Sequence, residues 1–364
     1  MIFCTLFDSN YLDKGLVMYR SLCDHVKEFK LYLLAIDQRC KEIIDAYRYE
    51  NIYTIDVDSF AKEMDLSDIR ETRSLGEFCW TCTSFLIDYV LTKCGENSCT
   101  YIDSDLCFYS DPTVLLNEMG EKTVQIVRHN FLNSPYGRIM QLNSGTYCVQ
   151  FNTFVKEDKA LELLHWWEER CRESCSNMSS TGVFGDQKYL EGWEKYKFVS
   201  ILDNLGGGVA PWNVSNYLRT SKENYNNSIR FIEKNTGKEY ELVFYHFHNL
   251  KYYDYTKVNI GVYEVWKADM ELVHEIYIQY LERINKTKEE LKNRFGFYPF
   301  IKIHPGLVRT KSKKSIKEWK YNLKNRPLDR LYIKTFFKIR QKKYASLNIL
   351  EFGQHNPHKY DEKI

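Results

Sequence analysis

The chain has 364 residues, of which 44% are hydrophobic and 27% are charged, values of an ordinary globular protein that exclude a disordered, collagenous or fibrous chain. The length predicts about two domains, and no apolar run reaches the roughly 18 residues of a transmembrane helix. The 51 basic and 49 acidic side chains nearly balance overall. Residues 308–344 carry fourteen Lys or Arg and two acids, so the net charge of this segment is +12 and that of the rest of the chain is −10.

The first predicted element is an apolar strand over residues 2–7. No basic leader precedes it and no small-residue cleavage site follows it, so we expect no secretory signal and a cytoplasmic location. The 11 cysteines are scattered, several of them inside apolar runs, and we expect reduced core thiols. Cys79 and Cys82 form a CxxC, but no second pair follows at zinc spacing, so a structural zinc is not expected.

Strands and helices alternate through the first half of the chain. The expected strands cover residues 2–7, 30–36, 52–57 and 98–106, and the expected helices cover 14–24, 41–49 and 77–93. Strands separated by helices predict the α/β class, with a mostly parallel central sheet and helices on both of its faces.

The pattern changes towards the C-terminus. Further strands are expected over 123–128, 145–152 and 242–247, with a helix over 156–172 between them. After about residue 275 only helices are expected, over 271–284 and 287–294, followed by the basic segment. We therefore predict one domain over residues 1–275 and a helical, basic C-terminal extension over 276–364.

The extension contains a candidate amphipathic helix. Five apolar side chains lie among basic residues there: Leu331, Tyr332, Phe336, Phe337 and Ile339. A basic amphipathic helix fits an anionic membrane surface, and a helix packed on the rest of the protein is the alternative. Nucleic acid is not expected, because no recognisable reading motif accompanies the charge. Truncation at about residue 307 is expected to leave the first domain functional.

The most informative segment is Thr100 to Phe108, where an apolar strand carries Asp103 and Asp105 at its end. On an extended backbone, residues i and i+2 point to the same side, so both carboxylates can approach one ion. The carboxyl end of a strand is also where open α/β sheets bind ligands. Two hard oxygen ligands suit Mg²⁺ or Mn²⁺. A solvated turn before Pro112 is the alternative.

A second segment, Phe244 to Lys251, places His246 and His248 on a strand and a lysine after them. One imidazole added to two carboxylates makes a donor set that favours Mn²⁺, and Lys251 can neutralise a diphosphate. A hydrogen-bonded core histidine is the alternative for either imidazole.

Two weaker signals complete the set. Asp186 and Gln187 open a short helical stretch, where an Asp is most often an N-cap. Asn143 precedes the strand over 145–152, and alone it indicates a turn.

These segments occur in an order that resembles a known family. The segments Asp8 to Tyr11, Tyr101 to Asp105, Asn143 to Gly145, Asp186-Gln187 and His246 to Lys251 resemble the signature set of GT-A nucleotide-sugar glycosyltransferases, nearest the glycogenin and lipopolysaccharide galactosyltransferase family, family 8. Related bacterial glycosyltransferases look closer still. The resemblance covers about residues 1–255 and implies a GT-A (Rossmann-like) sheet.

The resemblance also implies a role for each matching residue. Asp8, Asn10 and Tyr11 match positions that hold the base and ribose, and Ser104 is assigned to the nucleotide with them. Arg73 is similar to a basic position that touches donor sugar or phosphate.

The remaining matches concern the metal and the transferred sugar. Asp103, Asp105 and His246 match the metal ligands, and Lys251 matches the phosphate-binding lysine. The residues that match positions beside the anomeric carbon are Asn143, Asp186 and Gln187. The family's H-x-x-G-x-x-K-P-W has Asn249 in place of Gly and lacks Pro-Trp here, which leaves His248 as an alternative ligand to His246.

The resemblance therefore implies metal-dependent transfer of a sugar from a nucleoside-diphosphate sugar to an acceptor. The implied donor is a UDP-sugar, and the implied acceptor is a glycan or a lipid-linked glycan. The expected process is the assembly of bacterial surface polysaccharide or lipopolysaccharide. The resemblance implies retention of configuration; if the enzyme inverts, Asp186 is the expected base. A nucleotidyltransferase that makes the sugar nucleotide is the alternative, but the loop after the first strand lacks the glycine-rich, basic character of that class. A non-catalytic binding module would account only for the basic segment.

Overall fold

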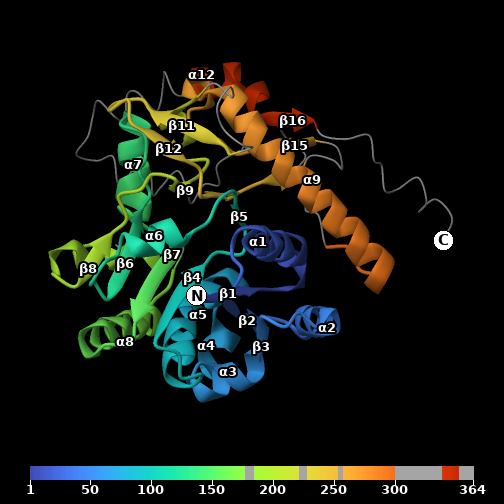
Figure 1. Ribbon diagram of the computed structural model, residues 1–364, viewed down its shortest axis with the longest axis vertical. Coiled ribbons are helices and arrows are strands. Elements are labelled where there is room, and N and C mark those ends of the chain that lie inside the picture. The colour runs from blue at the N-terminus through green and yellow to red at the C-terminus, as the bar shows by residue number, and fades with distance from the viewer. Residues whose placement is uncertain (177–183, 221–227, 253–256, 300–337, 352–364) are drawn as a thin grey trace.

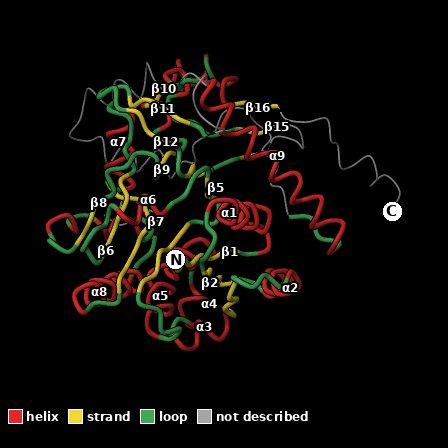
Figure 2. The backbone as a smooth tube through the Cα atoms, in the orientation of Figure 1, coloured by secondary structure: helices red, strands yellow, loops and turns green. Residues whose placement is uncertain are grey.

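The computed structural model describes residues 1–176, 184–220, 228–252, 257–299 and 338–351 (Figure 1). The structure contains one large β-sheet and several smaller ones among the described residues, and helices surround the strands of the large sheet (Figure 2).

The N-terminal part alternates strands and helices as predicted. Its elements are β1 (Ile2–Phe7), α1 (Leu12–His25), β2 (Lys30–Ala35), α2 (Gln38–Tyr47), β3 (Ile52–Asp56), α3 (Val57–Glu63), α4 (Ser67–Thr72), α5 (Leu75–Thr92) and β4 (Ser98–Ile102). Strand β1 pairs in parallel with both β2 and β4, and β2 pairs in parallel with β3. The order β3-β2-β1-β4 reverses direction between β1 and β4, so the ligand crevice of an open α/β sheet is expected at the carboxyl ends of these two strands.

In the part of the chain that the structure describes, the central sheet has seven strands in the order β3-β2-β1-β4-β7-β6-β8. The second half adds β6 (Val124–Arg128), α7 (Pro135–Ser144), β7 (Tyr147–Val155), α8 (Asp158–Glu173) and β8 (Val199–Ile201). Among the described strands of this sheet, only β7 runs antiparallel to its neighbours, so the prediction of a mostly parallel sheet is confirmed. Helix α7 was not predicted, because its polar end at Asn143 indicates a turn when taken alone.

Helices cover both faces of this sheet, as predicted. Alternate side chains of β1 point to opposite faces. Cys4 and Leu6 share a core with α5 and α8, whereas Phe3 packs with α1 and Phe7 with α1 and α2. The apolar runs of the strands are therefore explained by burial on both sides.

The predicted strand over 98–106 is wrong at its end. Strand β4 stops at Ile102, residues 103–105 form a turn closed by the Leu106 amide donating to the Asp103 carbonyl at 3.3 Å, and β5 (Leu106–Phe108) follows. Strand β5 leaves the central sheet and pairs antiparallel with β13 (Phe244–His246), which also pairs with β9 (Gly207–Val209). This pairing brings two segments about 140 residues apart to the carboxyl end of β4.

Helix α9 (Met270–Phe295) replaces the two helices predicted over 271–284 and 287–294. The predicted domain boundary near residue 275 lies inside it. Helix α9 runs alongside α1 (Figure 1), and a buried ion pair joins them, with Lys288 Nζ 3.3 Å from Asp13 Oδ2. We therefore propose that the first structural unit extends at least to Phe295.

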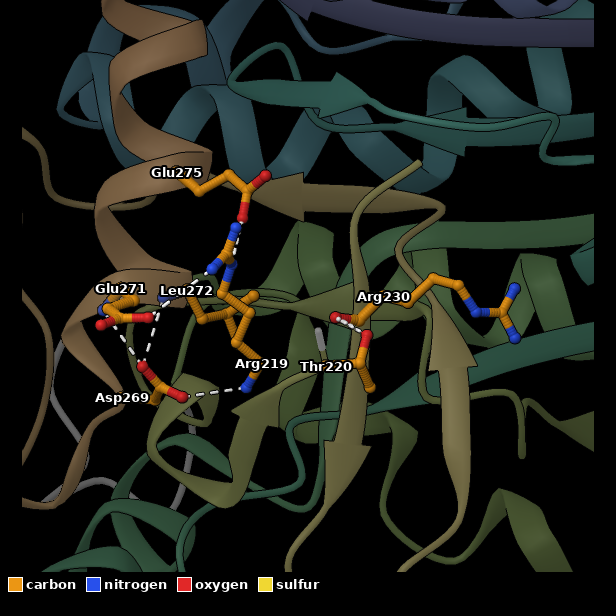
Figure 3. A network of polar contacts seen from close by, with 7 residues as sticks. All are labelled: Arg219, Thr220, Arg230, Asp269, Glu271, Leu272 and Glu275. Carbon is orange, nitrogen blue, oxygen red and sulfur yellow. Dashed lines mark hydrogen bonds and ion pairs between the residues drawn. The ribbon is translucent and has the colours of Figure 1, made fainter. Parts of the chain in front are cut away.

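A three-stranded sheet of β10 (Tyr217–Arg219), β11 (Arg230–Glu233) and β12 (Glu239–Glu241) packs near the start of α9. Figure 3 shows Arg219 reaching across to Asp269, which caps α9, and to Glu275 on the next turns. Arg219 Nε donates to Glu275 Oε2 at 2.6 Å. These contacts fix the N-terminal end of α9 to the sheet.

The described part of the C-terminal segment joins this same unit. Strand β16 (Ile349–Glu351) pairs with β15 (Lys257–Asn259), which pairs with β14 (Lys251–Tyr252). A cut at residue 307 would therefore remove a strand of the sheet that holds Lys251, and the separability of the extension stays a prediction. Helix α12 (Lys338–Lys343) precedes β16, and residues 331–337 of the candidate amphipathic helix lie outside the described residues. In the described part of the chain, no helix is both long and apolar enough to span a membrane.

Candidate active site

Three predicted ligand side chains meet at the carboxyl end of β4. Ligand atoms of Asp103, Asp105 and His246 all lie within 4.8 Å of one another. His246 Nε2 is 3.0 Å from Asp105 Oδ1 and 3.6 Å from Asp103 Oδ2. The carboxylates converge through the turn at 103–105 rather than along an extended strand, and His246 arrives because it pairs with Leu106 in the β5–β13 ladder.

His248 lies outside this group of ligand atoms. It is exposed, and its ring centroid is 5.7 Å from that of His246. Of the two histidines left open by the sequence, His246 is therefore the one that shares the cluster with the carboxylates.

Buried neighbours orient two of the three side chains. His246 Nδ1 donates to Gln150 Oε1 at 2.7 Å, and the Tyr101 hydroxyl donates to Asp103 Oδ1 at 3.0 Å. Gly208 lies beside the Gln150 amide at φ +111°, and a Cβ there would stand 3.1 Å from Gln150 Nε2. The glycine therefore leaves the room that the amide occupies.

The electrostatics of the cluster separate the two carboxylates. Burial raises the pKa of Asp103 to about 7, against the opposing charge of His246. Burial also acts to raise the pKa of Asp105, but the charge and hydrogen bond of His246 outweigh it and hold that pKa below its usual range. Burial opposes protonation of His246, yet Asp105 and Asp103 raise its pKa. The cluster thus favours a positive charge at its centre.

Asp186 lies close to this cluster. It is buried just before a short 3-10 helix (Gln187–Leu190), and burial together with the charge of Asp103 raises its pKa to about 8. Trp167 Nε1 donates to the Asp186 carbonyl at 3.0 Å. Gln187 Nε2 donates to the Ser144 carbonyl at 2.9 Å, which joins this segment to the end of α7, where Asn143 is buried. The structure therefore brings Asp186, Gln187 and Asn143 together.

The predicted nucleotide residues follow β1, the neighbour of β4. Asp8 Oδ2 accepts from Asn10 Nδ2 at 3.0 Å, and Tyr11 is 41% exposed at the end of a 3-10 helix (Ser9–Tyr11). The ammonium of Lys14 lies over the Tyr11 ring, 3.6 Å from its centroid. Lys14 acts to lower the pKa of Tyr11, but burial and the charge of Asp105 raise it. Burial opposes the charge of Lys14, but Tyr11, Asp13 and Asp105 raise its pKa.

Arg73 is engaged elsewhere. Its guanidinium donates to the Cys171 carbonyl at 2.6 Å, to the Arg172 carbonyl at the end of α8 and to the Thr81 hydroxyl. Its predicted contact with a donor stays a prediction. Ser104 is buried in the turn between the carboxylates, and Lys251 begins β14, five residues after His246.

Sequence reasoning missed Gln150 and Lys14. Gln150 lies in a nine-residue strand whose other side chains are mostly apolar, and it is fully buried. A polar amide at such a position requires a buried partner, and this is the signal that could have singled it out. Lys14 is three residues after Tyr11, and only the start of α1 at Leu12 turns it back over that ring.

No protein-family model matches the chain. Two proteins of Bacillus subtilis (strain 168), the uncharacterized proteins YfnF and YfnD, are similar to it. YfnF is 25% identical over 300 residues, which are 81% of this chain and 96% of YfnF. YfnD is 26% identical over 306 residues, which are 82% of this chain and 94% of YfnD.

The solved structures that resemble the chain include three glycosyltransferases, the class of enzyme that the sequence motifs resemble. One is the galactosyltransferase LgtC in complex with donor and acceptor sugar analogues, at 15% identity and a TM-score of 0.47, covering 87% of this chain and 100% of LgtC. Mouse xyloside xylosyltransferase 1 has 12% identity and a TM-score of 0.38, covering 56% and 86%. GlyE of Streptococcus pneumoniae TIGR4 has 19% identity and a TM-score of 0.33, covering 56% and 45%.

Proposed function

We propose that this protein is a glycosyltransferase that moves a sugar from a nucleoside-diphosphate sugar to a glycan acceptor. The observation that carries this proposal is the convergence of Asp103, Asp105 and His246 within 4.8 Å, at the carboxyl end of β4. This is the point where the strand order reverses, beside the segment Asp8 to Tyr11 that follows β1. A donor bound there would have its nucleotide at β1 and its diphosphate at the carboxylates.

The residues of the cluster fit a divalent cation. Two carboxylates and one imidazole form a donor set suited to Mn²⁺. Mg²⁺ prefers oxygen ligands, so the two carboxylates suit it better than the imidazole does. The hydrogen bond from Nδ1 to Gln150 leaves Nε2 as the atom that faces both carboxylates. When bound, such an ion would supply Lewis-acid stabilisation of the diphosphate leaving group.

Several side chains would bind and orient the donor directly. The exposed ring of Tyr11 offers a stacking surface for a base, and Asp8 and Asn10 offer hydrogen-bonding groups for the ribose. Lys14, which rests on Tyr11, and Lys251 would add positive charge towards the phosphates. By resemblance the base is uracil, and the donor is therefore a UDP-sugar.

Asp186 would act on the transferred sugar. With a cation held by Asp103, one of the two causes of its raised pKa is cancelled, and Asp186 would be ionised more readily when the donor is bound. A carboxylate at this place can stabilise positive charge on the anomeric carbon, which fits retention of configuration. In an inverting enzyme the same carboxylate would take the proton of the acceptor hydroxyl.

We also propose that the acceptor is a lipid-linked or surface glycan of bacterial polysaccharide or lipopolysaccharide assembly, met at the cytoplasmic face of an anionic membrane. The basic segment 308–344 supports this, and in its described part Ile339 is 67% exposed among Lys338, Lys342 and Lys343. Replacement of Lys311, Lys313, Lys314 and Lys317 by Gln should weaken salt-sensitive binding to anionic vesicles. Unchanged vesicle binding would exclude the membrane role of these lysines.

The test of the main proposal is a screen of nucleotide sugars by thermal shift with Mn²⁺, followed by identification of the released product. A donor at a hundred times its Kd stabilises the protein by about 2.7 kcal/mol, which a thermal shift detects. We expect release of nucleoside diphosphate from the stabilising donor. Production of pyrophosphate from a nucleoside triphosphate and a sugar phosphate would instead assign the protein to the nucleotidyltransferases.

A further inference from the structure

A second group of metal-binding side chains lies between α5 and α8. Ligand atoms of Asp88 on α5 and of His165 and Glu168 on α8 all lie within 4.8 Å of one another. Residues i and i+3 share a face of a helix, so His165 and Glu168 both point towards α5. Asp88 lies near the end of α5 that leads into the amino end of β4, whereas Asp103 follows its carboxyl end. The two groups are thus at opposite ends of that strand.

Glu168 is an unusual side chain for such a place. Its exposure is 8%, and its Oε1 is buried without a hydrogen-bond partner among the described residues. Arg172, one turn further along the same helix, donates to the Met64 and Asp65 carbonyls while lying over the Phe85 ring. Burying a carboxylate without a partner costs several kcal/mol, so either a proton or a cation must compensate it.

Burial together with the like charge of Asp88, which is 8% exposed, raises the pKa of Glu168 to about 8. The charge of Arg172 acts to lower the pKa of Glu168, but it does not outweigh burial and the neighbouring carboxylate of Asp88. His165 Nε2 lies 3.3 Å from Asp88 Oδ1. That is the spacing between two ligands of a tetrahedral ion whose ligand distances are about 2.0 Å.

The site is also open to an incoming ion. The His165 side chain is 54% exposed, so water can enter beside it and fill the coordination positions that the protein leaves. A closed structural site would need four protein ligands, whereas three ligands and an open side give an exchangeable site.

We propose that Asp88, His165 and Glu168 bind a second divalent cation of the Zn²⁺ class, which ties α5 to α8 away from the carboxylate cluster at the sheet edge. One nitrogen and two carboxylate oxygens are the ligand types of a three-ligand zinc site. The bound ion would place positive charge against the buried Glu168 carboxylate. This inference does not depend on the proposed glycosyltransferase activity.

Co²⁺ is a suitable spectroscopic probe for Zn²⁺. The experiment uses the full chain with Asp103→Asn and Asp105→Asn as the background protein, because these substitutions remove both carboxylate ligands of the first cluster. We expect this background to bind one Co²⁺ by equilibrium dialysis, with visible ligand-field absorption and without the near-ultraviolet band of thiolate ligands. Adding His165→Gln, which changes an exposed side chain and leaves the fold intact, should abolish that absorption, and Glu168→Gln should do the same. Glu169→Gln, the exposed neighbouring carboxylate, should not.

Two results would overturn the inference: no Co²⁺ bound by the background protein, or absorption unchanged by both His165→Gln and Glu168→Gln. Because the first cluster is already disabled, neither result bears on sugar transfer. Loss of nucleoside diphosphate release in the Asp103 variants, in turn, leaves the α5–α8 site untouched.

Discussion

His246 and Gln150 are joined by a buried hydrogen bond of 2.7 Å between the imidazole Nδ1 and the amide Oε1. An amide oxygen only accepts, so Nδ1 carries a proton in every state of the ring. Burial acts to lower the pKa of His246, but Asp105 and Asp103 raise it, which favours a proton on Nε2 when no cation is bound. A cation would replace the Nε2 proton without disturbing the bond to Gln150, so the ring is held ready as a ligand.

Gln150→Leu should weaken Mn²⁺ binding by about 10- to 100-fold, because the imidazole loses the group that fixes its orientation and tautomer. The measurement is Mn²⁺ affinity by electron paramagnetic resonance. Gln125→Leu is the matched control: Gln125 is also fully buried, in β6, and donates to the Leu115 carbonyl at 3.0 Å. If both variants bind Mn²⁺ equally well, Gln150 is only a core residue.

Asp186→Asn should lower turnover by on the order of 100-fold while donor affinity stays near that of the wild type, because the charge matters most as the sugar becomes cationic. Folding should be little affected, since burial and Asp103 keep Asp186 largely neutral at pH 7 without ligand. Steady-state kinetics and donor binding separate the two effects. Asp203→Asn, at an exposed carboxylate, is the control, and equal turnover in both variants would leave Asp186 without a role in catalysis.

His129 should make folding sensitive to acid. It is buried, stacked on Phe131 with centroids 4.6 Å apart, and burial lowers its pKa from 6.5 to about 3. Below pH 6.5 the unfolded chain binds a proton here that the folded chain refuses until about pH 3, so stability falls as the pH falls.

The comparison that isolates this effect is denaturant unfolding of the wild type and of His129→Phe between pH 7 and 5. The wild type should lose up to about 1.4 kcal/mol per pH unit more than the variant. His274→Gln, a half-buried histidine on α9, should behave as the wild type. Parallel pH profiles for the wild type and His129→Phe would contradict this assignment.

Asn348 should stabilise the fold from the far end of the chain. Its side chain accepts from the Val262 amide at 2.9 Å and donates to the Val262 carbonyl at 3.1 Å, just before β16. Asn348→Ala should cost about 1 to 2 kcal/mol, measured by denaturant unfolding, because both bonds are lost. Ser346→Ala, at an exposed neighbour, should cost far less; similar losses would mean that the segment is not held at Val262.

The alternation of strands and helices up to β4 follows from the sequence, because strands buried on both faces leave continuous apolar runs and the helices between them show a 3.6-residue period. The placement of Asp8 and Asp103 at one sheet edge follows from that alternation. The turn at 103–105 could not be predicted from the sequence, because Asp103 to Asp105 directly continues an apolar strand. The chain leaves the central sheet there because β5 pairs with β13.

Other features depend on contacts between distant segments. Gln150 can bond His246 only because β13 brings that side chain to it. The guanidinium of Arg73 donates to carbonyls at the end of α8, about 100 residues further along the chain. Strand β16 is too short to be recognised by its own pattern, and it forms by pairing with β15. Periodicity within one segment carries no information on such pairings.

The measurement that bears most directly on the proposed function is the release of nucleoside diphosphate from a nucleotide sugar by the wild type and by Asp103→Asn, with Mn²⁺ and with excess chelator. We expect release by the wild type with Mn²⁺, none in chelator, and a loss of at least about 100-fold in Asp103→Asn, whose fold should be intact because Asp103 lies in a turn at the sheet edge. Equal release by the wild type and Asp103→Asn, or release that chelator does not diminish, would contradict a metal-dependent glycosyltransferase built on this cluster.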